Sequence, residues 1–204
     1  MTTKRLLFSA ILIFLCAIQS WALTADPELP NLAKHKILIA YFSYSGNTEK
    51  MARQIHNLSA GILFRIKGLD PYIILNKKEV QERALSELEK NARPRIEDKV
   101  FNMTSYDIVF LGYPIWESTT PMIIHTFLES YDFSNKIIIP FATHDDEETH
   151  FAESLKVITK NAPNSIVFQG ISTVQGFTDR AFVLKHLKRI DKEVQAVFEK
   201  KGPS

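Results

Sequence analysis

The chain has 204 residues, of which 45% are hydrophobic, 24% charged and 11% aromatic, and its formal net charge is +2. Seven glycines and nine prolines are too few for a collagen-like or low-complexity chain, and the charged fraction is ordinary for a globular protein. Fibrous and disordered classes are therefore excluded, and the length fits one domain with a short appendage.

The first 22 residues have the pattern of a secretory signal peptide. Two basic residues precede an apolar run over residues 6–18, and small residues stand on both sides of Trp21. A helix over this run would be about 20 Å long, well short of the roughly 30 Å apolar core of a bilayer. We expect cleavage after Ala22 and a periplasmic or secreted protein. The alternative is an uncleaved membrane anchor.

Removal of this segment changes the charge and the cysteine content. Lys4 and Arg5 are its charged residues, so residues 23–204 have a formal net charge of zero. A neutral chain has no overall field that attracts nucleic acid or anionic lipid. Cys16, the single cysteine, leaves with the signal, which excludes disulfides and thiol chemistry. We expect no nucleic-acid partner and no stable membrane anchor after signal cleavage.

Strand-like and helix-like patterns alternate along the rest of the chain. Residues 23–35 are expected to form an irregular lead-in and residues 36–204 the domain. Five apolar strands alternating with helices predict a parallel sheet with helices on both faces. Strands are predicted over residues 36–42, 61–67, 106–111, 136–141 and 165–171, and helices over about 48–60, 149–160 and 178–200, with a further helix starting at Pro121 after a Thr120 cap.

The connection from Leu69 to Pro94 is long enough to hold a helix of its own. Asn76 and Glu79 have the spacing of a capping box, and Pro94 ends the helical pattern. Its apolar stripe is Val80, Ala84 and Leu88. The sequence does not indicate which part of the molecule this helix covers.

Parallel sheets of this kind bind ligands beyond the carboxyl ends of their strands. After the first strand, residues 43–48 read Ser-Tyr-Ser-Gly-Asn-Thr. Backbone N–H groups at a helix start, together with hydroxyls, can bind a phosphate without a lysine. The segment matches neither the P-loop nor the GxGxxG pattern. The alternative is a polar turn in which Ser45 or Asn47 caps the next helix.

After the third strand, residues 112–116 read Gly-Tyr-Pro-Ile-Trp. Gly112 is expected to permit a tight exit from the strand, and Pro114 to stiffen the turn. Trp116 would then offer a flat aromatic surface at the carboxyl edge of the sheet. It serves either as a platform for a planar ligand or as a cover for the sheet.

Residues 37–52, which read ILIAYFSYSGNTEKMA, resemble the opening of the flavodoxin family. The resemblance continues through DIVFLGYPIW at residues 107–116 and IIIPFAT at residues 137–143, and it covers the chain from about residue 36. It implies a flavodoxin-like three-layer α/β sandwich. Five parallel strands in the order 2-1-3-4-5 would carry helices on both faces.

The resemblance also implies non-covalent FMN and a set of residues that bind it. It implies no catalytic residue and no metal ligand. The phosphate would be held by Ser43, Ser45, Asn47 and Thr48, with the backbone of Tyr44 and Gly46, and the ring would be contacted by Pro114, Ile115 and Trp116, with Thr143 and His144 from the loop after the fourth strand.

Two departures from the family pattern bear on this site. Glu117 stands where this branch has a second aromatic residue, and residues 143–148 form an acidic loop in place of a small Ser/Gly-rich turn. Carboxylates here either lower the potential of a bound flavin or cap the next helix. Residues 144–150 have metal-ligand types but no known metal-binding spacing, so a solvated loop is expected.

Three functions stay open. The first is an electron carrier that serves a redox partner protein through FMN. The second is an NAD(P)H-dependent reductase of a quinone or another small acceptor. The third is a flavodoxin scaffold without flavin that acts as a binding module.

Overall fold

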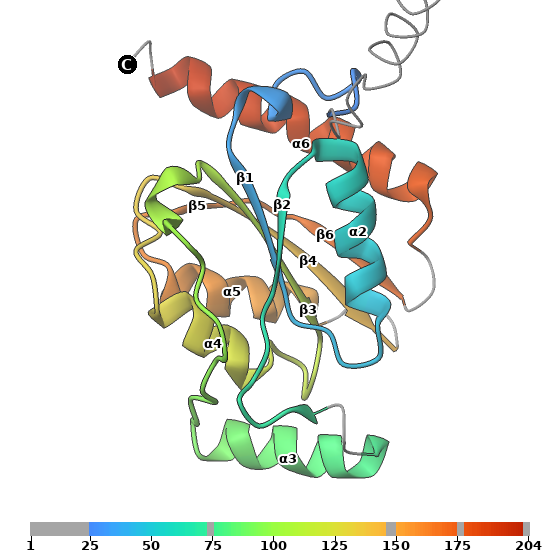
Figure 1. Ribbon diagram of the computed structural model, residues 1–204, viewed down its shortest axis with the longest axis vertical. Helices are drawn as coiled ribbons and strands as arrows, with labels where there is room; N and C mark the ends of the chain where they lie inside the picture. The colour runs from blue at the N-terminus through green and yellow to red at the C-terminus, as the bar shows by residue number, and fades with distance from the viewer. Residues whose placement is uncertain (1–24, 73–75, 146–149, 175–177, 202–204) are drawn as a thin grey trace, which may run out of the picture.

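The computed structural model describes residues 25–72, 76–145, 150–174 and 178–201, so the expected signal peptide lies outside it. A parallel sheet in the order β2-β1-β3-β4-β5 forms its centre, as predicted, and β6 also pairs with β4 (Figure 1). The strands are β1 (Ile37–Tyr41), β2 (Ile62–Arg65), β3 (Ile108–Pro114), β4 (Ile137–His144), β5 (Ile166–Val167) and β6 (Ile171–Val174). The helices are η1 (Leu32–Lys34), α2 (Asn47–Ser59), α3 (Lys77–Glu89), η3 (Met103–Ser105), α4 (Met122–Glu129), α5 (Phe151–Asn161) and α6 (Arg180–Lys201).

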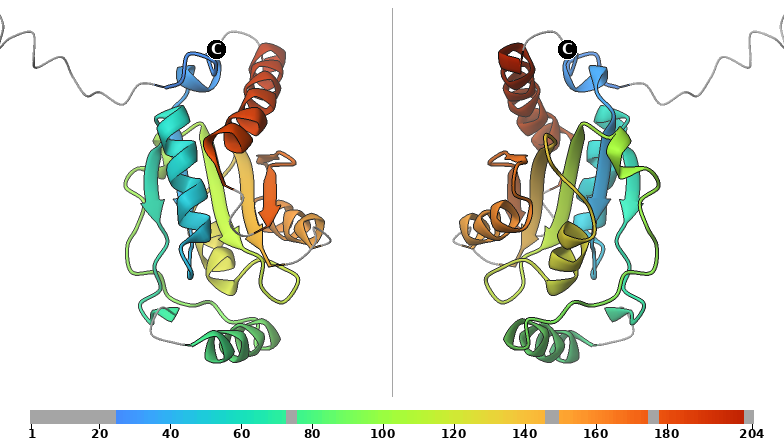
Figure 2. Two further views of the ribbon diagram at one scale, coloured as in Figure 1. Left: turned by 90° about the vertical axis from the view of Figure 1, so that its right-hand side faces the viewer. Right: turned by 90° about the vertical axis from the view of Figure 1, so that its left-hand side faces the viewer.

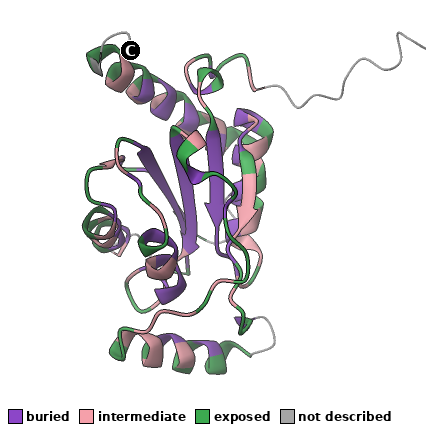
Figure 3. Cartoon of the chain, turned by 60° about the vertical axis from the view of Figure 1, so that its left-hand side comes forward, coloured by how far each residue is buried: buried purple, intermediate pink, exposed green. Residues whose placement is uncertain are grey.

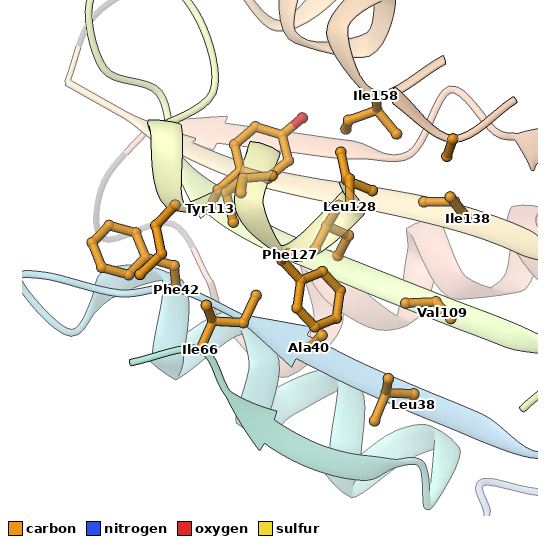
Figure 4. Packing of buried hydrophobic residues seen from close by; sticks show 14 of the residues in the cluster. Leu38, Ala40, Phe42, Ile66, Val109, Tyr113, Phe127, Leu128, Ile138 and Ile158 are labelled. Carbon is orange, nitrogen blue, oxygen red and sulfur yellow. The ribbon is translucent and has the colours of Figure 1, made fainter. Parts of the chain in front are cut away.

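The sheet has an apolar core on each face, because successive side chains of a strand point to opposite sides. Ile37 and Ile39 of β1 pack in the cluster that contains α2 and α6 residues, whereas Leu38 and Ala40 pack in the cluster that contains α4 and α5 residues. The central strands are buried along nearly their whole length (Figure 3). Figure 4 shows the second cluster, with Leu38, Ala40, Val109, Phe127, Leu128, Ile138 and Ile158.

The fifth strand is interrupted, whereas the sequence predicts one strand over 165–171. β5 ends at Val167, and pairing with β4 resumes only at Ile171. Ile138 accepts a hydrogen bond from Phe168 on this side of β4. Pro140, two residues further, faces the same side but has no N–H to donate. The missing donor explains why the strand breaks opposite it.

The lead-in packs more tightly than an irregular appendage would. Leu29 and Leu32 are fully buried in the core next to α6. The backbone N–H groups of Asn31 and Leu32 donate to the buried carboxylate of Asp191 on α6, at 3.0 and 2.7 Å. Residues 25–35 therefore belong structurally to the domain.

The helix of the long connection, α3, lies across the carboxyl end of the sheet (Figures 1 and 2). The predicted capping box is confirmed: Asn76 accepts from the Glu79 backbone at 3.0 Å and donates its own N–H to the Glu79 side chain at 2.8 Å. At its base, Gly68 pairs antiparallel with Ile96. The long connection, residues 69–94, thus starts and ends side by side.

Candidate functional site

The loop after β1 is held in shape by one serine. Ser43 Oγ accepts hydrogen bonds from the N–H groups of Gly46 and Glu49, at 3.2 and 3.3 Å. Gly46 has a left-handed backbone (φ +91°) and directly precedes α2. The first N–H groups of a helix have no carbonyl partner inside it and carry the positive end of its dipole. The result is a polar cup, formed by residues 43–48, suited to an anion.

The hydroxyls of the cup have different surroundings. Ser43 and Thr48 are buried, and Thr48 Oγ1 lies 2.9 Å from Thr143 Oγ1 at the end of β4. Ser45 is exposed at the tip of the loop. The buried hydroxyls therefore shape the cup and fasten it to β4. The structure does not follow the alternative in which Ser45 or Asn47 caps the next helix, because the N-cap of α2 is Gly46 and the Glu49 N–H in its first turn donates to Ser43.

A basic residue that the sequence analysis missed stands beside the cup. Arg65, the last residue of β2, donates from Nη2 to the Ser43 carbonyl at 3.4 Å. Its Nη1 also lies 3.4 Å from Glu49, which pairs with Arg53 as well, at 2.7 Å. Two guanidinium groups thus offset the one carboxylate in the first turn of α2. The sequence carried one indication of this role, which is that Arg65 is a basic residue at the end of the strand predicted next to the first one.

The expected role of Gly112 is wrong. Strand β3 continues to Pro114, so Gly112 lies inside the strand and not at its exit. A Cβ placed on Gly112 would come within 2.1 Å of the Phe141 ring on β4. The glycine is required by this close packing, which lies directly beneath the two loops of the site.

The loop after β3 is a tight hairpin. Trp116 and Thr119 exchange backbone hydrogen bonds of 3.0 and 2.9 Å. The two residues between them, Glu117 and Ser118, have φ of +46° and +64°, which is the pattern of a type I′ turn. Glu117, the departure from the family pattern, is therefore an exposed turn residue.

Trp116 lies among aromatic side chains from other parts of the chain. Its ring is 5.3 Å from Phe42, 5.4 Å from Tyr72 and 6.3 Å from Tyr44, measured between centroids, in tilted or edge-on arrangements. Such geometries are favourable for aromatic pairs. The structure brings Trp116 next to the cup, since Tyr44 belongs to residues 43–48. Tyr72 comes from the long connection and was not among the predicted site residues.

Thr143 and His144 end strand β4 and are not part of the loop predicted there. Their side chains point to opposite faces because they are consecutive residues of one strand. Thr143 meets Thr48 of the cup. His144 is buried on the α5 side, and its Nε2 lies 3.0 Å from Ser172 Oγ of β6. The structure therefore joins Thr143 to the cup and places His144 on the opposite face.

Only part of the acidic loop falls within the described residues. Asp145 is exposed and forms an ion pair of 3.5 Å with Lys77 of α3. Residues 146–149 lie outside the description, and α5 begins after His150 without a side-chain cap. Among the residues that the structure describes, no three His, Cys, Asp or Glu side chains gather as metal ligands would.

Thr120 does not cap α4 as predicted. The helix begins at Met122 behind Pro121, without a side-chain cap. Thr120 Oγ1 instead lies 3.0 Å from Nε2 of His125. Burial lowers the pKa of His125, with Arg93 adding to the effect. The pair fastens the end of the Trp116 loop to α4.

The molecule is an open parallel sheet with a polar cup after its first strand and an aromatic loop after its third. These features define a class of α/β proteins that bind ligands at the carboxyl edge of the sheet. Residues 36–185 match the family described as flavodoxin. The chain belongs to the flavodoxin family.

Solved structures agree with this assignment. A candidate flavoprotein from Bacteroides eggerthii is 32% identical, with a TM-score of 0.66, and the match covers 76% of this chain and 98% of that one. A second, from Bacteroides uniformis, is 28% identical with the same TM-score and coverage. A Lactobacillus acidophilus flavoprotein in complex with FMN shares the fold at 23% identity and a TM-score of 0.57, over 69% of this chain and 93% of that one. No curated protein matches the chain.

Proposed function

We propose that this protein binds FMN at the carboxyl edge of its sheet and transfers electrons to or from a redox partner protein. The N–H groups at the start of α2 bind the phosphate, and Arg65 adds positive charge next to them. Trp116 contacts the ring. FMN supplies the redox chemistry when bound, and the chain supplies position and electrostatics.

One observation carries the proposal: the cup and Trp116 are fixed next to each other. Thr48 joins the cup to Thr143, and the Ile115 N–H donates to the Thr143 carbonyl at 2.9 Å, so β4 fastens both loops. Tyr44 in turn reaches the Trp116 ring. A single ligand with a phosphate and a flat ring would meet both loops. Family membership and the FMN-bound relative support the same assignment.

A titration of FMN, followed by the quenching of its fluorescence, tests the proposal. Trp116→Ala should weaken both quenching and affinity. Phe101→Ala is the matched control, because Phe101 is 92% exposed and precedes the amino end of β3, at the opposite edge of the sheet. No binding by the unaltered chain at high micromolar FMN would contradict the proposal and favour a flavin-free binding scaffold.

A reductase of small acceptors is the second candidate, and an open cavity favours it. The cavity, about 920 Å³, lies beside β6 between α5 and α6. Its walls combine aromatic and apolar groups with imidazole and hydroxyl groups. These residues include His144, Phe151, Leu155, Ser172, Phe182 and His186. A quinone needs an apolar wall and hydrogen-bond partners for its oxygens, and this cavity provides both.

Steady-state kinetics separates the two candidates. A reductase takes a hydride from a nicotinamide and, with a proton from water, reduces a quinone to a quinol. The reductase is expected to turn over NADH or NADPH with a soluble quinone, and Leu155→Trp should raise the KM for the quinone by filling the cavity. A carrier is reduced by dithionite but shows no such turnover.

We also propose that the chain is exported and released by cleavage after Ala22. The signal-like pattern of residues 1–22 supports this proposal. Across the described ranges, no helix is long and apolar enough to cross a membrane. The intact mass of the protein recovered from the producing cells tests it. A mass that still includes residues 1–22 would contradict cleavage.

A further inference from the structure

Helix α3 covers the loop that carries Trp116. Ala84, Glu87 and Leu88 of α3 face Trp116 and the residues up to Met122 across a crevice of only about 10 Å³. That volume has room for roughly one water molecule. The long connection, whose role the sequence did not indicate, is therefore packed directly against the proposed ring-binding loop.

Tyr72 makes the contact between this connection and Trp116. The side chain is 3% exposed, and its ring lies 5.4 Å from Trp116 and 5.3 Å from Phe42. Aromatic pairs at these distances add to the stability that burial alone provides. Trp116 is thus supported by a residue that lies 44 positions earlier in the chain.

Two residues of α3 hold Tyr72 in turn. The Tyr72 hydroxyl donates to Glu87 Oε2 at 2.5 Å, and Arg83 Nε donates to Glu87 Oε1 at 2.7 Å. The Arg83 guanidinium also lies 3.8 Å from the centre of the Tyr72 ring. Each of the three side chains therefore contacts the other two. Arg83 additionally pairs with Asp70 at 3.4 Å.

We propose that Tyr72, held by Glu87 and Arg83, is a positioning residue that sets the orientation of Trp116 for the ring of the bound cofactor. The inference rests on the proposed function for the cofactor, but the positioning of Trp116 can be measured without it. Helix α3 acts on the site through Tyr72. Burial and the neighbouring Glu87 raise the pKa of Tyr72, so its hydroxyl stays a donor at any ordinary pH.

Trp116 can report on its own surroundings. The full chain has two tryptophans, Trp21 and Trp116, and the proposed cleavage after Ala22 removes the first. Trp116 is then the single emitter, and a Trp21→Phe background gives the same result in the uncleaved chain. In this background we would compare Tyr72→Leu, Tyr72→Phe and Arg83→Met. Lys78→Met is the matched control for Arg83→Met, because it removes the same charge from α3 at a side chain that is 84% exposed and forms an ion pair with the neighbouring Glu82.

Without FMN, Tyr72→Leu and Arg83→Met should shift the Trp116 emission to longer wavelength and increase its quenching by acrylamide. With FMN, Tyr72→Leu should weaken binding about tenfold, the upper end of what one aromatic pair contributes. Tyr72→Phe keeps the ring and should show smaller changes in the same direction. Lys78→Met should match the parent in every measurement.

The outcomes separate the two ideas. Unchanged Trp116 emission and quenching in folded Tyr72→Leu, with far-UV circular dichroism as the folding check, would overturn the positioning role. Altered Trp116 signals with parent-like FMN affinity would overturn its relevance to the cofactor. If Tyr72→Leu alters the Trp116 emission and quenching but the parent binds no FMN, the proposed function is contradicted, whereas the support of Trp116 by Tyr72 stands.

Discussion

The loop after β1 and the loop after β3 lie side by side at the carboxyl edge, yet different forces hold them. The first is closed by Ser43 Oγ, which accepts from N–H groups three and six residues further along the chain. The second carries Trp116, whose ring packs against Tyr72 and Phe42 from distant segments. Local hydrogen bonds shape the cup, and long-range packing places the ring platform. Substitutions should therefore affect the two loops separately unless they disturb the contact of Trp116 with Tyr44 or the strand residue Gly112, which lies beneath both loops and is called their shared floor below.

The largest effect should come from the shared floor. Gly112 pairs with Tyr41 on one side and Phe141 on the other, below both loops. Gly112→Ala would force a methyl group against the Phe141 ring, and overpacking of this kind costs about 1–3 kcal/mol. We expect a lower urea midpoint, weaker FMN binding and altered Trp116 emission together.

A double-mutant cycle with Phe141→Leu identifies the cause. The cost of Gly112→Ala should be smaller by more than about 1 kcal/mol once the ring is gone, because the two residues are in contact. Equal costs in both backgrounds would show that the Phe141 ring is not what requires the glycine.

The second-largest effect is expected from breaking the hydrogen bond that connects the cup to β4. Thr48→Val removes the partner of the buried Thr143 hydroxyl, which lies 2.9 Å away, and should cost about 1–2 kcal/mol in urea unfolding. The Thr48→Val/Thr143→Val pair should cost less than the two single changes added together, because no unpaired hydroxyl is left. Simple additivity would contradict a direct Thr48–Thr143 hydrogen bond.

The same division explains how much the sequence could predict. The cup residues are contiguous and carry a short-range signal, as do the alternating strands and the Asn76–Glu79 capping box, so these features could be predicted. Gly112 was misjudged because its constraint is the Phe141 ring on a neighbouring strand. Tyr72 was missed because its role depends on where the long connection returns, and apolar periodicity carries no such information.

The third effect should be confined to the cup. Ser43→Ala removes the acceptor for the Gly46 and Glu49 N–H groups and should cost about 1 kcal/mol of stability, as the loss of a capping side chain does. FMN affinity should fall while Trp116 emission without FMN stays as in the parent. Ser45→Ala, at the exposed tip of the same loop, is the control and should leave stability unchanged. A Trp116 shift in Ser43→Ala would show that the two loops are not held independently.

The smallest effect concerns pH and the far end of the Trp116 loop. Burial and Arg93 lower the pKa of His125 below its ordinary value of 6.5, whereas Glu129 opposes this change. A lowered pKa means that the unfolded chain binds the proton more tightly, so stability is full above the ordinary pKa and falls as the pH drops below it. We expect a lower urea midpoint at about pH 5.5 than at about pH 7.5.

His125→Gln should make this decline shallower, because glutamine can still meet Thr120 Oγ1 but does not titrate. The decline should not vanish, because burial lowers the pKa of His35 as well, on the opposite edge of the sheet. His35→Gln should therefore also make the fall of the urea midpoint with decreasing pH shallower, without changing any residue near Trp116. Trp116 emission should follow pH only where His125 is present, since His125 fastens the end of that loop. If the Trp116 emission of His125→Gln still changes with pH, a titrating group other than His125 is responsible for the change.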